Sequence, residues 1–361
     1  MEEGKQVRLT SGELAILWAQ YLNDTSSVCL LTYFLEKAED SEIKSIIENA
    51  LRLSLAHIEK ITQILTEEKN HIPQGFKIDE DVNLSAPRLF SDTYVLNFIH
   101  QMARIGLGGY GVSLSLSVRH DITEFYQDCL TEYMNLYKNS KDILLSKGLY
   151  IRSPYIPNLD HNEFVQKQSF VLDFGEKRPL TALEIVNLYS NIQRNSLGVA
   201  TLIGFSQVAK SKEVTSYFTR GIEIATKHIE KFGGKMKESN LTVPMIYGTD
   251  VTTSTQYTFS DKLMMFYTTA LIGLGVGFYG ASCSVSPRLD LGVLYNTLSI
   301  DIQRYAEDGA NIMIKNRWLE QPPMAPNRNE LANESNEYGS CLGNCLFFFL
   351  MYILFLQTVT T

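Results

Sequence analysis

The sequence predicts an all-α protein built as a tandem duplication of one four-helix bundle. Two observations carry this prediction: apolar residues recur at helical spacing over long segments, and motifs of the first half of the chain return in the second half. Alternation of apolar and polar residues, which would indicate strands, is nowhere sustained. With 361 residues, 45% of them hydrophobic and 20% charged, the chain can build two globular domains and is not of disordered composition.

The duplication is visible in short motifs that recur at an offset of 171 or 169 residues. The motif pairs are Leu-Thr-x-x-Glu at 9–13 and 180–184, His-Ile-Glu-Lys at 57–60 and 228–231, Phe-Ser-Asp at 90–92 and 259–261, and Arg-x-Asp at 119–121 and 288–290. We therefore expect a bundle at 8–150, a linker at 151–179, a second bundle at 180–320 and a tail at 321–361.

Each repeat is predicted to contain four helices, which start at residues that favour helix N-termini. The first helix starts at a capping box, in which a threonine hydroxyl accepts from the N3 amide and a glutamate accepts from the cap amide. The expected starts are Thr10-x-x-Glu13, Ser41, Ser91 and Asp121 in the first repeat, and Thr181-x-x-Glu184, Ser211, Ser260 and Ser286-Pro287 in the second. The second helices are expected to end near Glu67 and Lys237.

The connections predict how the helices are arranged. Few residues join the first two helices, so these should be antiparallel neighbours. About 20 residues at 71–90, including Pro73, Gly75 and Pro87, join the second helix to the third. A loop of this length suits a crossover that spans the bundle, as in ferritin-like folds with one long connection.

The composition and the two ends of the chain limit which partners and cellular compartments are expected. The formal net charge of −8 argues against a nucleic-acid partner. Five cysteines, odd in number and without a Cys-x-x-Cys pair, predict a reducing compartment rather than a disulfide framework. The N-terminus lacks the apolar segment of a secretory signal. Residues 341–359 are mostly apolar and approach the roughly 17–25 residues that span a membrane, so membrane contact through this tail is an open alternative.

Polar residues fall on helix faces that are otherwise apolar. On a helical wheel His57 and Glu132 face inward, Asp24 lies at the edge of the inner face, and a rise of 1.5 Å per residue puts them level with one another. The candidate polar layer of the first repeat is Asp24, His57, Tyr110 and Glu132, and its copy in the second is Asn195, His228, Tyr279 and Asp301. Asn139 and Asp308 are expected two turns further along the same inward face.

Two interpretations of these layers stay open. Buried carboxylates and imidazoles are costly without partners, so each layer needs hydrogen bonds or a ligand. The favoured interpretation is a hydrogen-bonded layer that sets helix register and does no chemistry. The alternative is a site for a divalent metal ion or a small ligand, although one histidine per bundle is few for a transition metal. The candidate metal ligands are His57, Glu132, Asp24, His228, Asp301 and Asp308.

Several motifs with known chemistry are discounted. A di-iron site needs an inward Glu-x-x-His on two helices, and the sequence offers one, Glu68-x-x-His71, at a helix end. The Gly-x-Gly-x-x-Gly matches at 106–111 and 275–280 lack a preceding strand, so we interpret them as close-packing points or the lining of a cavity rather than a dinucleotide site. Cys129 is expected in the core, and the Arg-x-Asp motifs are expected to form charge-paired turns.

With the duplication, the motifs above and the closing Glu-Gln-Pro-Pro-Met-Ala-Pro at 320–326 in view, the chain resembles a known family. It is similar to the duplicated helical proteins of endospore-forming bacteria catalogued as domain of unknown function 3231. The resemblance covers about residues 8–330 and implies a ferritin-like fold and, for some members, a provisional spore-coat label. Because the family has no established activity, the resemblance assigns no catalytic residues. The tail after about Glu330 departs from the family pattern.

Together these observations predict a non-catalytic structural or interaction protein of spore-forming bacteria, with protein partners in the spore and no enzymatic activity. The alternative is a metal- or small-ligand-binding protein that uses the polar layers. The expected localisation is cytoplasmic or spore-associated, and attachment to a membrane through 341–359 stays open.

Overall fold

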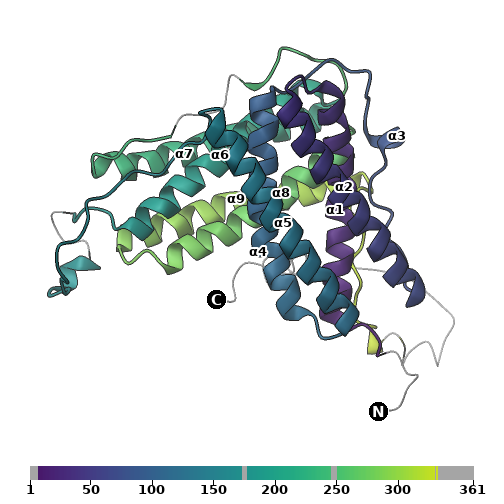
Figure 1. The fold of residues 1–361 in the computed structure, drawn as a ribbon, viewed down its shortest axis with the longest axis horizontal. Helices are drawn as coiled ribbons and strands as arrows, with labels where there is room; N and C mark the ends of the chain where they lie inside the picture. The colour runs from purple at the N-terminus through teal and green to yellow at the C-terminus, as the bar shows by residue number, and fades with distance from the viewer. Residues whose placement is uncertain (1–6, 173–176, 245–249, 330, 332–361) are drawn as a thin grey trace.

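The structure is a computed structural model that describes residues 7–172, 177–244, 250–329 and 331. Its long helices form two four-helix bundles, so the predicted all-α duplication is confirmed (Figure 1). The first bundle consists of α1 (Ser11–Lys37), α2 (Ser41–Glu67), α4 (Asp92–Leu116) and α5 (His120–Ser146). The second consists of α6 (Ala182–Val208), α7 (Lys212–Glu238), α8 (Asp261–Ser284) and α9 (Leu289–Lys315). Two short elements, α3 (Ile78–Asp81) and the 3₁₀ helix η1 (Gln168–Phe170), lie in connections.

The predicted helix starts are largely confirmed. The Thr10 hydroxyl accepts from the Glu13 amide at 3.1 Å while the Glu13 carboxylate accepts from the Thr10 amide at 2.8 Å. Thr181 and Glu184 form the same capping box at the start of α6. Serine N-caps are present at the starts of α4, α7 and α8.

Two predicted starts are wrong. The N-cap of α2 is Asp40 rather than Ser41, because the Asp40 carboxylate accepts from two amides at the helix N-terminus. The start of α9 is Leu289, after Arg288, rather than the Ser286-Pro287 pair. The Glu184 carboxylate accepts from the Arg288 amide at 3.2 Å, so a residue from another helix satisfies this amide at the start of α9.

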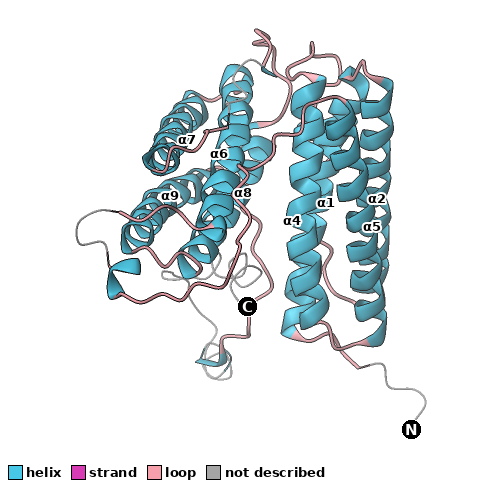
Figure 2. Cartoon of the chain, turned by 60° about the vertical axis from the view of Figure 1, so that its left-hand side comes forward, coloured by secondary structure: helices cyan, strands magenta, loops and turns pink. Residues whose placement is uncertain are grey.

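Each bundle is two antiparallel hairpins joined by a long crossover, as expected. In the first bundle α1 packs on α2 and α4 packs on α5, and residues 68–91 carry the chain from one hairpin to the other. The second bundle repeats this arrangement with α6 on α7 and α8 on α9. Figure 2 shows the two bundles side by side, with their long axes inclined to each other.

The two crossovers pair with each other. Val82 forms an antiparallel bridge with Phe259, and Phe90 forms one with Val251. Val82 and Val251 are equivalent positions of the two repeats, as are Phe90 and Phe259. The contacts are therefore exchanged reciprocally, as across the two-fold axis of a homodimer.

The helix caps next to these bridges show the same exchange. The hydroxyl of Ser91, the N-cap of α4, donates to Asp250 at 2.8 Å. The hydroxyl of Ser260, the N-cap of α8, donates to Asp81 at 2.5 Å. Because each cap side chain binds the crossover of the other repeat, the ends of α4 and α8 are fixed to both bundles.

One hydrophobic core continues from the first bundle into the second. The Tyr33 ring packs edge-on against Phe259 with centroids 4.9 Å apart, and Phe98 stacks on Tyr267 at 5.6 Å. The Tyr94 hydroxyl lies 2.8 Å from that of Thr201 across the same contact. The bundles therefore form a single packed unit.

Within the described part of the chain, α8 alone has the length and apolar composition of a membrane-spanning helix. Its most apolar window is 44% buried inside the fold, where it contributes to the core. The predicted apolar segment at 341–359 lies outside the described residues.

Candidate functional site: two polar layers and the cavity between the bundles

The polar layer predicted for the first bundle is assembled in the structure. His57 on α2 is 3% exposed, and its Nε2 lies 3.0 Å from the Glu132 carboxylate on α5. Its Nδ1 lies 3.5 Å from the Asp24 carboxylate on α1. The ring of Tyr110 on α4 packs edge-on against the imidazole at 5.8 Å. One residue from each helix of the bundle therefore meets at the predicted level.

The surroundings of His57 favour its charged form. Burial by itself would lower the pKa of His57, but the contacts with Asp24, Cys129 and Glu132 outweigh this and raise the pKa well above its ordinary value. The first layer is therefore an imidazolium held between two carboxylates.

The second layer is built from the equivalent residues but differs in its hydrogen bonds and its charge state. The hydroxyl of Tyr279 lies 2.9 Å from Nδ1 of His228 and accepts from the Asn195 amide at 2.9 Å. Burial lowers the pKa of His228 to about 4, and the attraction of Asp301 is too weak to reverse this. The Asp301 carboxylate is 3.8 Å from the imidazole and binds Lys227 at 2.7 Å. This layer therefore holds a neutral histidine.

Asp308 and Asn139 do not lie where the sequence predicted. Asp308 is 52% exposed and forms an ion pair with Arg220 at 2.6 Å on the surface, and Asn139 is also exposed. The inward face of α9 at this level is made by Tyr305 and Gly309, which turns Asp308 outward. On α5 the buried position is Ser140, whose hydroxyl is 3.0 Å from His100.

The metal interpretation of the layers gains no support from the geometry. Among the residues that the structure describes, no three histidine, cysteine, aspartate or glutamate side chains are placed to hold one metal ion. His57 is hydrogen-bonded to Glu132 through Nε2, whereas Nδ1 lies 3.5 Å from Asp24 and has no hydrogen-bond partner among the described residues. A metal site at His57, Glu132 and Asp24, or at His228 and Asp301, stays a prediction.

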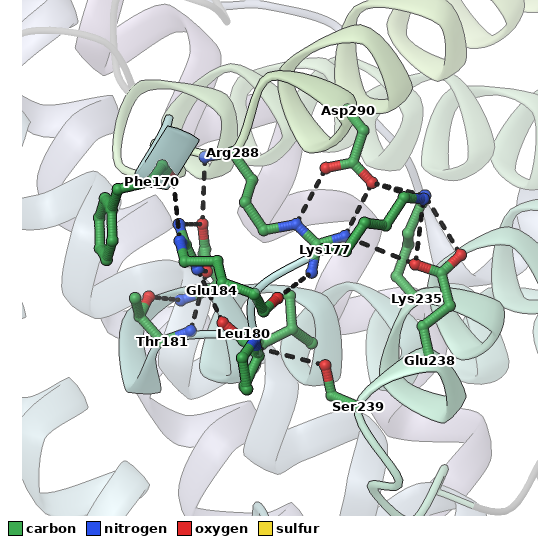
Figure 3. A network of polar contacts seen from close by, with 12 residues as sticks. Phe170, Lys177, Leu180, Thr181, Glu184, Lys235, Glu238, Ser239, Arg288 and Asp290 are labelled. Atoms are coloured by element: carbon green, nitrogen blue, oxygen red, sulfur yellow. Dashed lines mark hydrogen bonds and ion pairs between the residues drawn. The ribbon is translucent and has the colours of Figure 1, made fainter. Parts of the chain in front are cut away.

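The Arg-x-Asp motifs form charge-paired turns, as predicted. Figure 3 shows the second of them, where Arg288 binds Asp290 at 2.8 Å and approaches Glu238 at 3.4 Å. Lys235 binds Asp290 at 2.6 Å, and nearby Glu184 accepts from Arg178 at 2.8 Å. These pairs tie the start of α9 to the end of α7 and the start of α6. Because the charges are paired within the protein, this cluster is structural.

A cavity of about 350 Å³ lies between the two bundles. Helices from both bundles line it, and the glycine-rich motifs contribute Gly106, Gly108, Gly109 and Gly275, so a glycine-lined cavity is present as the sequence suggested. Both polar layers also reach it, through Asp24 and Tyr110 on one side and Asn195 and Tyr279 on the other. The remaining lining is predominantly apolar.

The comparisons with known proteins now identify the family. The model of the family described as "Protein of unknown function (DUF3231)" matches residues 2–161 and 169–331, which is most of the chain in two consecutive repeats. The chain belongs to this family. No curated protein matches the sequence significantly. The resemblance inferred from the motifs is therefore confirmed, and the two bundles are two DUF3231 repeats.

One solved structure is similar. It is the crystal structure of a "putative spore coat protein" from Bacillus halodurans C-125, which is 16% identical. The match covers 42% of this chain and 98% of that one, with a TM-score of 0.37.

Sequence reasoning missed the two arginines that line the cavity, Arg104 on α4 and Arg194 on α6. The signal that could have found them is a difference between the two DUF3231 repeats. At the positions equivalent to Arg104 and Arg194 the other repeat has Gly273 and Asn23. Because only one repeat has an arginine at each of these positions, the fold shared by both repeats does not require it. Such an arginine is therefore a candidate for a role other than folding.

Proposed function

We propose that this protein is a non-catalytic binding protein that holds a small, mainly apolar molecule between its two bundles. The observation that carries the proposal is the cavity of about 350 Å³ at this interface. Its volume falls in the range of about 300–1,000 Å³ that is typical of small-molecule sites, and interfaces between units of a fold are common places for such sites.

Several glycines leave this space open. A Cβ atom added at Gly108, Gly109 or Gly198 would meet no other atom within 4 Å, and all three residues line the cavity. A glycine inside a helix is destabilising by roughly 0.5–1 kcal/mol relative to alanine. Three such glycines beside one cavity are consistent with selection for space rather than for helix stability.

The polar groups at the cavity favour binding over acid–base chemistry. Burial raises the pKa of the phenols of Tyr110, Tyr133 and Tyr279 above their ordinary values. These hydroxyls therefore stay protonated at neutral pH, where they can form hydrogen bonds but do not act as bases.

The test is binding of the neutral fluorophore N-phenyl-1-naphthylamine to the full chain, together with a variant that fills the cavity. An added Cβ at Gly198 meets no atom within 4 Å, so Gly198→Leu should direct a side chain into the cavity and reduce the affinity at least tenfold. The matched control is Gly234→Leu, at an exposed helical glycine that also has open space at its Cβ and does not line the cavity. Unchanged binding in Gly198→Leu, or a wild type that binds neither this fluorophore nor the alkyl probes described below, would contradict the proposal.

A structural or interaction role in spore-forming bacteria, with protein partners in the spore, is the finer prediction from the family resemblance. It is compatible with ligand binding, since a binding protein can also be a component of an assembly. Spore association and membrane contact through 341–359 likewise stay predictions. Fractionation of the intact chain and of a chain ending before residue 341 checks the membrane contact.

The ferritin-like classification of the bundles also stays a prediction, and so does a divalent metal ion in the layers. Elemental analysis of protein purified without chelator tests the metal ion. About one or two metal ions per chain, lost in His57→Ala combined with His228→Ala, would support a metal site. Metal-free protein would leave the layers structural.

A further inference from the structure

We propose that the ligand of the interbundle cavity is an amphipathic anion, whose carboxylate or phosphate head is held by Arg104 and Arg194. The apolar body of the ligand would lie against the apolar lining between the bundles. This inference rests on the proposed function and specifies the chemical class of the ligand.

The two arginines reach the cavity from opposite bundles. Arg104 belongs to α4 of the first bundle and Arg194 to α6 of the second, and both line the same space. A guanidinium has five N–H donors and recognises carboxylate or phosphate oxygens in a planar, bidentate way. An anion between two such groups would join the bundles by charge as well as by apolar contact.

Neither guanidinium has an acidic partner within the described ranges. Arg104 donates to the Gln101 side chain at 3.4 Å, and Arg194 donates to the Asn191 side chain at 2.8 Å. No carboxylate oxygen of the described residues lies within 4.0 Å of the guanidinium of Arg104 or of Arg194. The arginines of the charged turns, Arg119 and Arg288, are by contrast paired with carboxylates.

The two positive charges also oppose each other. Burial and the nearby Arg104 lower the pKa of Arg194 to about 9, so the group stays charged at neutral pH in an unfavourable setting. Charges removed from water are costly unless they are paired. A bound anion would pair both charges, which offsets the cost of burying Arg194 and the repulsion between the two arginines.

The acidic group at the cavity does not cancel these charges. Asp24 lines the same space, but it faces His57 in the first polar layer at 3.5 Å. The raised pKa of His57 means that this carboxylate already has a positive partner. Asp24 lies beyond ion-pair distance of Arg104 and Arg194, so neither arginine has a carboxylate partner in the lining.

The rest of the lining suits an apolar body. The guanidinium of Arg194 lies 3.9 Å from the ring centroid of Phe278, which places a charged head next to an aromatic surface. Apolar side chains from both bundles continue the lining, and these are Met102, Ile105, Leu197, Leu271, Ile272 and Leu274. A molecule with one anionic end and an apolar remainder matches this division.

The experiment is calorimetric titration of the full chain with decanoate, decyl phosphate and decan-1-ol, which share one apolar chain and differ in the head. We expect at least one of the anions to bind ten times or more tightly than the alcohol. Which anion binds more tightly distinguishes a fatty-acid-like carboxylate from a phosphate monoester.

Arg104→Met and Arg194→Met remove the charges but keep a long apolar side chain. Each should weaken binding of the preferred anion about tenfold while leaving decan-1-ol unchanged. Arg52→Met is the control, because Arg52 is exposed on α2 and does not line the cavity. Circular dichroism and urea unfolding verify that the variants fold.

The results that would overturn the anion inference differ from those that would overturn the binding function. Equal binding of the anions and the alcohol, unaffected by Arg104→Met or Arg194→Met, would overturn the anion inference and leave the binding function standing. If none of the three binds and N-phenyl-1-naphthylamine does not bind either, both proposals fail. Binding of the fluorophore without any of the three probes would overturn this inference alone.

Discussion

His57 and His228 occupy the same position of the repeated His-Ile-Glu-Lys motif and yet carry opposite charge states. Part of the difference follows from one position, because Asp24 faces His57 whereas the equivalent Asn195 binds the tyrosine beside His228. A second carboxylate, Asp301, is too far from His228 and too strongly engaged by Lys227 to compensate. The exchange of Asp24 for Asn195 and the greater distance of Asp301 together favour a neutral histidine in the second layer.

This predicts distinct titrations for the two histidines. In long-range ¹H–¹⁵N spectra of histidine-labelled protein, His57 should stay protonated at pH 7.5 and His228 should stay neutral at pH 5.5. Asp24→Asn should lower the pKa of His57 by more than one unit, and Asn195→Asp should raise that of His228. Both histidines titrating together near pH 6.5 would contradict the assignment.

The same shifts predict how stability depends on pH. In the folded chain the pKa of His228 is about 4, below the ordinary 6.5, so the unfolded chain binds the proton first as pH falls. His228 therefore lowers the free energy of unfolding as pH falls from about 6.5 to 4. His57, with a raised folded pKa, removes stability as pH rises above 6.5. Each histidine can change the free energy of unfolding by at most about 1.4 kcal/mol per pH unit. Urea unfolding of the wild type and of Asp24→Asn across pH 4–9 measures this change.

Among the connecting elements, the crossovers are held tightly although they are long. The first starts against α1, where Gly75 has a φ of +59° and a Cβ atom would lie 2.6 Å from the Thr25 hydroxyl oxygen. Lys262 from α8 also donates to the Gly75 carbonyl at 2.9 Å. The crossover is thus packed against its own bundle and bound to the other one.

Gly75→Ala should therefore lower the free energy of unfolding by more than the backbone strain of a positive φ does alone. Gly148 offers the comparison, since it has a φ of +67° and no atom within 4 Å of an added Cβ. We expect Gly148→Ala to lower the free energy of unfolding by about 1 kcal/mol from backbone strain. Gly75→Ala should lose about 1–3 kcal/mol more from the clash with Thr25. Equal losses in urea unfolding would mean that the contact with α1 is not rigid.

For the complete chain, the reciprocal contacts between crossovers make the two repeats one cooperative unit. Phe90 and Phe259 are the equivalent aromatic residues of this contact and are 3% and 0% exposed. We expect a single calorimetric transition for the wild type, because both bundles share one core.

Phe90→Ala combined with Phe259→Ala should separate the unfolding of the two bundles. Each substitution removes a buried ring at a cost of about 3–5 kcal/mol, and the loss falls on the contact between them. Phe125→Ala is the control, because Phe125 packs in a cluster confined to the first bundle and its loss should lower the melting temperature without splitting the transition. One transition in the double variant would show that the remaining interface is sufficient for coupling.

The sequence by itself determined the helices, their duplication and the level at which the polar residues meet. Helical periodicity, capping boxes and a rise of 1.5 Å per residue are local properties, so Asp24, His57 and Glu132 could be placed together from their positions along the helices. The same reasoning misplaced Asp308, because a wheel does not define which edge of a helix the neighbouring helices cover.

Only the tertiary structure decided how the two bundles meet. Asp81 and Ser260, or Asp250 and Ser91, are far apart in the sequence, and no local pattern indicates that they bind across repeats. The cavity and the convergence of Arg104 and Arg194 depend on that meeting. A sequence pattern reports which face of a helix is buried, whereas the identity of the surface that covers it is set by packing in three dimensions.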